Sequence, residues 1–299
     1  MRNKKPICLI DATIALDEQH INQISEYFDI AIFHNDKLDL RLMQKAEAFL
    51  LHSRLSSENL SELINCKYVG IRAHNLDYID IEAARKMKIE VCGIPPVGQR
   101  SVAEHTFALI FALAKHLFFS HQNVQSGKWR KLIPPSIELY KKYLGVIGYG
   151  AIGKKVAEIG RCMGMNVVVY DSKEGEGHVP LDDLLSLADV VTIHIPYRPP
   201  NHNFIDHQRI SMMKNGALLI NTARGGLLDY NALETALRSE KISGAGIDVF
   251  ENEPPTVPNS LFDLPNVILT PHIAYYSREA LFQMNSHLVE NLIRYFRKI

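Results

Sequence analysis

The stretch Leu144-Gly-Val-Ile-Gly148-Tyr-Gly150-Ala-Ile-Gly153 decides the fold of this chain. The apolar residues 144–147 are typical of a strand buried in a parallel sheet. The spacing of apolar residues over 154–164 predicts a helix. Three glycines therefore occupy the turn from a strand into a helix, and each of them has its own physical role there.

Such a turn is suited to the phosphates of a dinucleotide. Gly148 permits the tight turn, Gly150 lets the backbone approach a pyrophosphate, and Gly153 lets the helix pack closely on the strand. The phosphate charge then meets the unpaired N–H groups and the positive dipole end of the helix. We therefore expect cofactor contacts from the turn residues Gly148, Tyr149, Gly150, Ala151, Ile152 and Gly153.

An acidic residue follows at the distance that this kind of site requires. Residues 165–170 predict a second strand, and Asp171 closes it about 20 residues beyond the last glycine. A carboxylate there accepts the ribose hydroxyls of an adenosine and repels a 2′-phosphate, which favours NAD over NADP. Lys173 could tolerate a 2′-phosphate, but a solvated lysine is the simpler interpretation, and we expect NAD as the cofactor.

The composition is that of an ordinary globular protein, and it argues against several functions. The 299 residues are many for one hydrophobic core, so we expect two domains. Lysine plus arginine (33) equals aspartate plus glutamate (33), which argues against a nucleic-acid partner. The four cysteines show neither metal-ligand spacing nor a disulfide framework, so we expect no metal. No apolar run approaches the length of a membrane span, and we expect a cytoplasmic protein without a membrane partner.

Up to residue 96 the chain alternates short apolar runs with helical or polar segments. This alternation predicts a small α/β domain with a parallel sheet. The tripeptide Ile94-Pro-Pro96 breaks regular structure and marks a boundary. The expected strands of this domain lie at residues 7–10, 30–33, 48–51, 68–71 and 89–92.

Beyond the boundary, residues 101–125 predict one long helix that is apolar on much of its surface. Such a helix is buried between domains or between subunits. Later strands are expected at residues 190–195, 217–221, 245–249 and 267–270, and later helices at 231–239 and 281–297. The fold class is α/β: a Rossmann-type parallel-sheet cofactor domain plus a smaller, flavodoxin-like α/β substrate domain, with a cleft between them.

Arg224, Glu253 and His272 follow the last three expected strands in turn. In an open parallel sheet the carboxyl ends of the strands meet at one edge, where ligands bind. Taken alone, each residue also suits a solvated or turn position. Together, at three strand ends beside a cofactor site, they predict a catalytic site near the nicotinamide.

These residue types suit the reduction of a 2-oxo acid. A planar guanidinium grips a carboxylate in bidentate fashion and polarises a neighbouring carbonyl. A histidine titrates near neutral pH and can give a proton to the carbonyl oxygen as hydride arrives. A carboxylate on the other ring nitrogen fixes the tautomer and holds the proton on the histidine. We predict Arg224 as the substrate clamp, Glu253 as the orienting carboxylate and His272 as the acid–base.

At these residues the sequence is similar to a known family over nearly its whole length. It resembles the NAD-dependent D-isomer-specific 2-hydroxyacid dehydrogenases in the glycine turn and in three later blocks, and the segment Val102-Ala-Glu-His-Thr106 resembles the family's interdomain helix. The later blocks are Asn221-Thr-Ala-Arg-Gly-Gly-Leu-Leu-Asp229, Gly246-Ile-Asp-Val-Phe-Glu-Asn-Glu-Pro254 and Thr270-Pro-His-Ile-Ala274.

The resemblance implies the same roles for the arginine, the glutamate and the histidine. It also implies a homodimer and a C-terminal helix that returns to the first domain. Residues 1–96 and 276–299 would then form the substrate-binding domain, and residues 97–275 the NAD-binding domain. Further cofactor contacts are expected from Val102, His194, Ile195, Pro196, Thr222, Ala223, Asp248 and His272.

The expected substrate contacts carry mixed signals about the substrate. Asn75 stands where the family usually has a glycine whose N–H binds the substrate carboxylate, and asparagine tolerates the left-handed conformation such a turn requires. Residues 97–100 lack the aromatic of lactate-type members, whereas residues 272–277 resemble the lactate-type ending. The 2-hydroxy acid therefore stays open, with contacts expected from Ala73, His74, Asn75, Arg224 and Tyr275.

We expect an enzyme that transfers a hydride between NAD(H) and a D-2-hydroxy acid/2-oxo acid pair, a small-molecule substrate. The alternative is an NAD-sensing, corepressor-like binding protein of the same fold. Such proteins usually carry partner-binding extensions, and we expect none here. A methyltransferase that uses glycines and an acidic residue would have no need of Arg224, Glu253 and His272.

Overall fold

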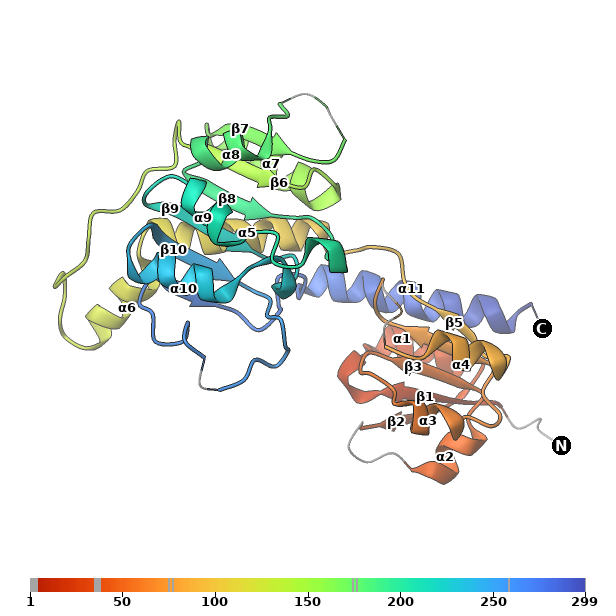
Figure 1. Cartoon of the computed structure of the whole chain (residues 1–299). Helices are drawn as coiled ribbons and strands as arrows, with labels where there is room; N and C mark the ends of the chain where they lie inside the picture. Colours follow the sequence, from red (N-terminus) through yellow and green to blue (C-terminus); the bar gives the residue numbers. More distant parts are fainter. Residues whose placement is uncertain are drawn as a thin grey trace. The chain divides into compact units, whose positions relative to one another are not determined.

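A computed structural model of the chain describes residues 5–34, 39–74, 76, 78–173, 175, 177–257 and 259–298. The chain forms two compact units (Figure 1). The smaller unit consists of Met1–Gly98 and Arg278–Ile299, and the larger of Gln99–Ser277. Each unit is built on a parallel sheet, which confirms the predicted α/β fold class.

The smaller unit has a five-stranded sheet in the order β2-β1-β3-β4-β5. This is the strand order of flavodoxin-like folds, in which the direction of winding reverses between the first and third strands. All neighbouring strands are parallel. The strands are β1 (Ile7–Asp11), β2 (Asp29–Phe33), β3 (Ala48–Leu51), β4 (Tyr68–Ile71) and β5 (Glu90–Cys92).

Helices cover both faces of this sheet because successive strand residues point to opposite sides. Cys8 and Ile10 of β1 lie in the core under α1 (Glu18–Ser25) and α11 (Arg278–Phe296). Leu9 between them lies in the core on the other face. The helices of that second face are α2 (Leu40–Lys45), α3 (Ser57–Ser61) and α4 (Ile81–Lys86).

The larger unit has a six-stranded parallel sheet in the order β11-β10-β9-β8-β6-β7. Val169 of β7 forms an isolated parallel bridge with His178. This bridge lies at the edge of the sheet where a Rossmann fold has a further strand. The direction of winding reverses between β6 and β8, which is where such sheets bind ligands. The strands are β6 (Tyr143–Ile147), β7 (Asn166–Tyr170), β8 (Val190–Ile193), β9 (Ala217–Asn221), β10 (Ile242–Ile247) and β11 (Val267–Leu269).

Two hydrophobic cores flank this sheet. Leu218 and Ile220 of β9 lie in the core under α5 (Gln99–Ala114) and α7 (Ala151–Cys162), whereas Ala217 and Leu219 lie in the core on the opposite face. The helices of the opposite face are α8 (Leu181–Leu187), α9 (His207–Met212) and α10 (Tyr230–Arg238), as Figure 1 shows.

The prediction of one helix over residues 101–125 is wrong. Helix α5 ends at Ala114, and α6 (Leu117–Gln125) continues at an angle of 58° to it. His116 between them has φ +51°, a left-handed conformation that interrupts the helical hydrogen bonds. No single helix in the described ranges is long and apolar enough to cross a bilayer, although the bent α5–α6 pair together meets that length and composition.

The carboxylate of Asp11 ties together two strand ends of the smaller unit. Oδ1 accepts hydrogen bonds from the N–H and hydroxyl of Thr13, at 2.9 and 2.7 Å. Oδ2 accepts from the N–H groups of His52 and Ser53, at 3.1 and 2.8 Å, and from the Ser53 hydroxyl. Burial favours the neutral acid, but these hydrogen bonds outweigh it and lower the pKa of Asp11 to about 2.

Replacing Asp11→Asn should destabilise the smaller unit. The amide NH₂ of asparagine would face backbone donors, at a cost of about 1–3 kcal/mol at neutral pH. Because the pKa of Asp11 is lowered from 3.8 to about 2, its charge stabilises the fold above the unfolded value, and this contribution is lost as the pH falls toward 2. Urea unfolding should therefore show that the free energy of unfolding of Asp11→Asn is lower than that of wild type at neutral pH, and that this difference becomes smaller below pH 4. A difference in the free energy of unfolding that does not change with pH would contradict this account.

Candidate active site

The turn between β6 and α7 has the backbone that its glycines predict. Gly148 has φ +97°, in the left-handed region, and a Cβ there would lie 2.6 Å from the carbonyl carbon and oxygen of His194. A Cβ on Gly153 would lie 1.9 Å from the Gly148 oxygen. Both positions are therefore closed to a side chain by neighbouring backbone.

Gly150 differs from its neighbours, because a Cβ there would meet no atom of the described chain within 4 Å. The fold itself does not require glycine at this position. The open space lies at the N-terminal end of α7, whose first turn presents unpaired N–H groups. An anionic pyrophosphate fits here, with its charge beside the positive end of the helix dipole.

Asp171 lies directly after β7, beside the same turn. Its Oδ2 accepts a hydrogen bond from the N–H of Tyr149 at 2.6 Å, and its Oδ1 accepts from the N–H of Lys173 at 3.0 Å. The hydrogen bond from Tyr149 is the largest of the influences that hold the pKa of Asp171 below its usual value. The carboxylate is thus ionised and half-buried at the position where a ribose would lie.

His194 follows β8 at the point where the winding of the sheet reverses. Its N–H donates to the Ile147 oxygen at 2.6 Å, and its Nε2 lies 2.9 Å from the Thr192 hydroxyl. Burial of the ring lowers the pKa of His194 to about 3, so the imidazole is neutral at physiological pH. Among the described residues, Nδ1 of this ring is buried without a hydrogen-bond partner.

The loop after β9 delivers Arg224. The side chain of Asn221 bridges the loop, because its amide donates to the Arg224 oxygen at 2.9 Å and its oxygen accepts the Ala223 N–H at 3.0 Å. A Cβ on Gly225 would lie 2.0 Å from the carbonyl carbon of Phe250, so the loops after β9 and β10 touch through backbone. This contact brings the exposed guanidinium of Arg224 close to the segment that carries Glu253.

Glu253 and His272 form a hydrogen-bonded pair. Glu253 Oε2 lies 2.6 Å from His272 Nδ1, and Oε1 accepts the N–H of Phe250 at 3.0 Å. Both side chains are 37% exposed. Burial opposes ionisation of Glu253, but the hydrogen bonds from His272 and Phe250 and the charge of Arg224 hold its pKa below the usual value. Nδ1 of His272 is the donor in this pair, and Nε2 is the nitrogen left for a substrate.

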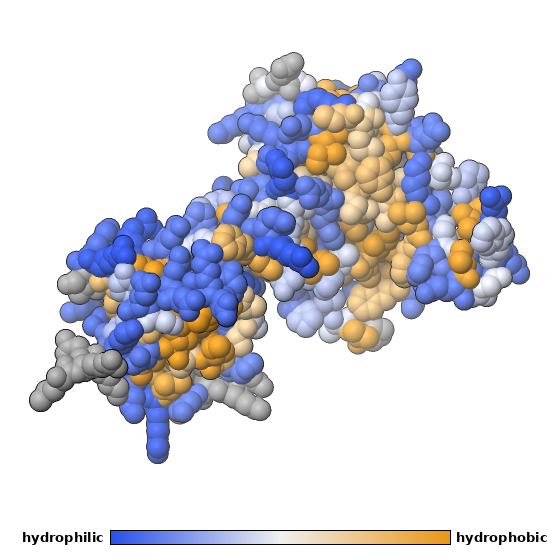
Figure 2. Space-filling model, turned by 180° about the vertical axis from the view of Figure 1, so that it is seen from behind, coloured by the Kyte–Doolittle hydropathy of each residue, from blue (hydrophilic) through white to orange (hydrophobic). Residues whose placement is uncertain are grey.

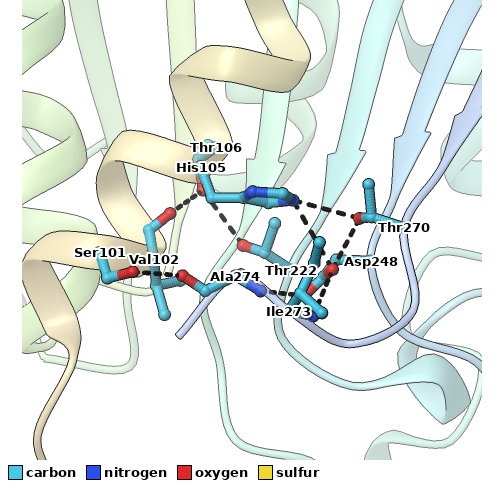
Figure 3. Close-up of polar contacts among 9 residues, drawn as sticks. All are labelled: Ser101, Val102, His105, Thr106, Thr222, Asp248, Thr270, Ile273 and Ala274. Carbon is cyan, nitrogen blue, oxygen red and sulfur yellow. Dashed lines mark hydrogen bonds and ion pairs between the residues drawn. The ribbon is translucent and has the colours of Figure 1, made fainter. Parts of the chain in front are cut away.

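The backbone of the histidine loop is held by one fully buried residue, Asp248 (Figure 3). The N–H of His272 donates to the Asp248 main-chain oxygen at 2.7 Å. The next two N–H groups, of Ile273 and Ala274, donate to its carboxylate oxygens at 2.9 Å each. His272 itself has φ +54°, a conformation that only a well-determined environment maintains.

The remaining predicted contacts are distributed over both units. Val102 and Thr222 are buried in the larger unit, where the Thr106 hydroxyl links them through bonds to the Val102 oxygen (2.8 Å) and the Thr222 hydroxyl (3.1 Å). The ring of Tyr275 lies edge-on to that of His272, with centroids 6.1 Å apart. In the smaller unit Ala73 and His74 follow β4, whereas Asn75 lies outside the described residues; the other larger-unit positions are Ile195, Pro196 and Ala223.

The sequence interpretation missed two side chains that contact this site, His105 and Thr270. The His105 Nε2 lies 3.1 Å from the Thr270 hydroxyl, which donates to Asp248 Oδ1 at 2.6 Å. Only their positions in the sequence could have indicated these contacts. Thr270 is separated from His272 by one residue, and His105 lies one helical turn after Ser101. Neither residue type marks such a contact by itself.

Known proteins resemble the chain in both sequence and structure. Residues 107–274 match the D-isomer specific 2-hydroxyacid dehydrogenase, NAD binding domain. A glycerate dehydrogenase from Methylorubrum extorquens is 35% identical over 292 residues, which cover 95% of this chain and 92% of that protein. The pyruvate reductase structure from Chlamydomonas reinhardtii has a TM-score of 0.88 at 30% identity, covering 97% of this chain and 96% of its own. D-lactate dehydrogenase from Aquifex aeolicus, complexed with NAD and lactic acid, has a TM-score of 0.80 at 32% identity, with coverage of 97% and 96%.

The fold and the glycine turn define an oxidoreductase that uses NAD. The chain belongs to the D-isomer specific 2-hydroxyacid dehydrogenase family. The predicted family and cofactor are thereby confirmed.

Two glycine substitutions separate cofactor binding from folding. Gly150→Ala places its methyl group in open space, so stability should stay at the wild-type level while NADH binding weakens by about tenfold or more, because the pyrophosphate loses its close approach. Gly153→Ala drives a methyl group into the Gly148 backbone and should lower the free energy of unfolding by about 1–3 kcal/mol. Fluorescence titration with NADH and urea unfolding measure the two effects, and unchanged NADH affinity in Gly150→Ala would contradict the pyrophosphate site.

Proposed function

We propose that the protein interconverts a 2-oxo acid and the corresponding D-2-hydroxy acid. In the reductive direction, the 2-oxo acid, NADH and one proton give the D-2-hydroxy acid and NAD. When bound, the nicotinamide supplies or accepts the hydride. The observation that carries this proposal is the 2.6 Å pair between Glu253 and His272, at a strand end that neighbours Arg224.

Arg224 binds the substrate carboxylate in this proposal. Its guanidinium is exposed, and Asn221 fixes the loop that carries it. A guanidinium matches the two oxygens of a carboxylate with parallel hydrogen bonds. Its charge also attracts electron density from the adjacent carbonyl, which prepares the carbon for reduction.

His272 gives a proton to the carbonyl oxygen during reduction and takes it back during oxidation. Nε2 faces this task because Nδ1 is engaged by Glu253. The ionised Glu253 stabilises the imidazolium that exists before the proton is given up. The charge of Glu253 is itself maintained by Arg224 and by the Phe250 N–H.

The preferred substrate also depends on the contacts made to its side chain. We propose that Ala73, His74, Asn75 and Tyr275 contribute to this specificity, with Tyr275 supported by its contact with the His272 ring. The relatives are named for glycerate, pyruvate and lactate. Pyruvate and lactate carry a methyl group beside C2, whereas glycerate carries a hydroxymethyl group. A panel of 2-oxo acids, each tested with NADH and NADPH, determines the preferred side chain and the cofactor preference.

Substitutions in the pair and the clamp should each suppress turnover. His272→Gln removes the proton donor and should lower kcat/KM by about 10²–10⁴, and Arg224→Gln removes the clamp and should lower it by about 10²–10³. Glu253→Gln removes the anionic partner of His272 Nδ1 and should lower kcat. NADH oxidation by each purified variant measures these effects.

Two substitutions outside the site serve as controls, because they remove the same kinds of side chain, a histidine ring and an arginine charge, at other positions. His287→Gln on α11 and Arg238→Gln on α10 change exposed residues and should leave kcat/KM at the wild-type value. Near-normal activity in Arg224→Gln would remove the carboxylate clamp from the proposal. Tight NADH binding without turnover of any 2-oxo acid would instead favour an NAD-sensing role.

We also propose that the protein is a homodimer. Figure 2 shows hydrophobic residues gathered on one face of the larger unit. The exposed apolar side chains that follow Ala114 are numerous for so short a stretch of chain, and exposed patches of this kind mark protein interfaces. They are Leu117, Phe118, Val124, Trp129, Leu132 and Tyr140.

Sedimentation equilibrium should give twice the mass of the 33.8-kDa chain. Phe118→Asp places a charge among these apolar residues and should shift the protein toward the monomer, because an unpaired buried charge is costly. Ile64→Asp, at an equally exposed site in the smaller unit, should leave the mass unchanged. A wild-type mass equal to that of one chain would contradict the dimer.

A cytoplasmic location is the last part of this proposal. All four cysteines are free thiols, and two of them, Cys8 and Cys66, are buried in the smaller unit. Proteins that keep their cysteines reduced are typical of a reducing compartment.

A further inference from the structure

We propose that His105 and Thr270 are positioning residues for His272, acting through the buried carboxylate of Asp248. This inference rests on the proposed function, in which His272 moves the proton. Asp248 is fully buried, and its carboxylate accepts hydrogen bonds from the loop that carries His272. The network lies entirely in the larger unit (Figure 3).

Asp248 accepts hydrogen bonds from several donors in the loop after β11. Three successive N–H groups, of His272, Ile273 and Ala274, donate to its main-chain oxygen, Oδ1 and Oδ2. These bonds fix the peptide planes on both sides of the His272 side chain. Asp248 therefore helps to fix the backbone from which the imidazole extends.

The side-chain hydrogen bonds of this network have a fixed direction. The carboxylate of Asp248 only accepts, so the Thr270 hydroxyl, 2.6 Å from Oδ1, must donate its single proton there. The same hydroxyl oxygen lies 3.1 Å from His105 Nε2 and must accept from it. His105 therefore carries a proton on Nε2, and this nitrogen also lies 3.6 Å from Asp248 Oδ1. One directed chain runs from His105 through Thr270 to Asp248.

This chain of hydrogen bonds begins on helix α5. Ser101 and His105 lie one turn apart on the same face of this helix. The Ser101 hydroxyl donates to the Ala274 oxygen at 2.8 Å, so α5 holds the histidine loop at two points. The helix is itself anchored in the core by residues such as Phe107 and Ile110. The loop is thus held by a helix that packs against the six-stranded sheet.

The function of this alignment follows from the sensitivity of proton transfer to distance. His105 is linked to the His272 backbone through Thr270 and Asp248, so we assign it a positioning role. A displacement of a reacting group by about 1 Å can cost about a hundredfold in rate. Loss of the network should therefore lower kcat and leave the affinities for NADH and substrate nearly unchanged.

Two isosteric substitutions test the network. Thr270→Val and His105→Phe remove the donors while keeping most of the volume, and each should lower kcat by about 10- to 100-fold with KM values within about threefold of wild type. The conservative variants Thr270→Ser and His105→Gln keep a donor at the required atom and should retain kcat within about threefold of wild type. Thr235→Val, on the exposed face of α10, is the matched control and should have no effect.

Amide hydrogen exchange gives a second readout that needs no turnover. In Thr270→Val and His105→Phe, the N–H groups of residues 272–274 should exchange about tenfold faster than in wild type, because the carboxylate that holds them has lost an orienting donor. The amides of α10 serve as the internal reference. If wild type reduces no 2-oxo acid, the proposed function fails, and the exchange rates still decide whether the network positions the loop.

Three results would overturn the inference. Wild-type kcat together with unchanged exchange in both donor-removing variants would show that the network does not hold His272. Equal loss in Thr270→Ser and Thr270→Val would show that the hydroxyl is not the active group. If Thr270→Val fails to fold, the pair His105→Phe and His105→Gln decides in the same way.

Discussion

Three consecutive backbone N–H groups at the end of β11 converge on one residue, Asp248 at the end of β10. A buried carboxylate is stable only when donors surround it, and here the donors belong to the loop that carries His272. The same bonds hold His272 in a left-handed backbone conformation that is unfavourable for most residues. The same hydrogen bonds therefore stabilise the buried carboxylate of Asp248 and hold the backbone of His272.

The rest of the site depends on the geometry of a parallel sheet. Strands β9, β10 and β11 are neighbours, so the loops that follow them meet at one edge. Gly225 permits direct backbone contact between two of these loops, and this contact brings the charge of Arg224 near Glu253. Glu253 then orients the His272 ring through Nδ1, which leaves Nε2 free of this pairing.

Most of the fold and part of the site could be predicted from the sequence, for physical reasons that differ among residues. The glycine turn and Asp171 could be predicted because a pyrophosphate and a ribose impose a fixed spacing on them. The break at His116 could not, because the apolar pattern continues through Leu117 while the bend depends on a backbone angle. The contact between His105 and Thr270 joins residues 165 positions apart, and neither type signals such a partner.

The stereochemical course of hydride transfer tests the central claim that this site reduces a 2-oxo acid to a D-2-hydroxy acid. NADH that carries deuterium at both C4 positions would be incubated with the best substrate of the 2-oxo acid panel, and the product resolved by chiral chromatography and mass spectrometry. We expect the D-2-hydroxy acid with one deuterium at C2, formed about 10²–10⁴-fold more slowly by His272→Gln than by wild type. An L product, or a D product without deuterium at C2, would contradict this claim.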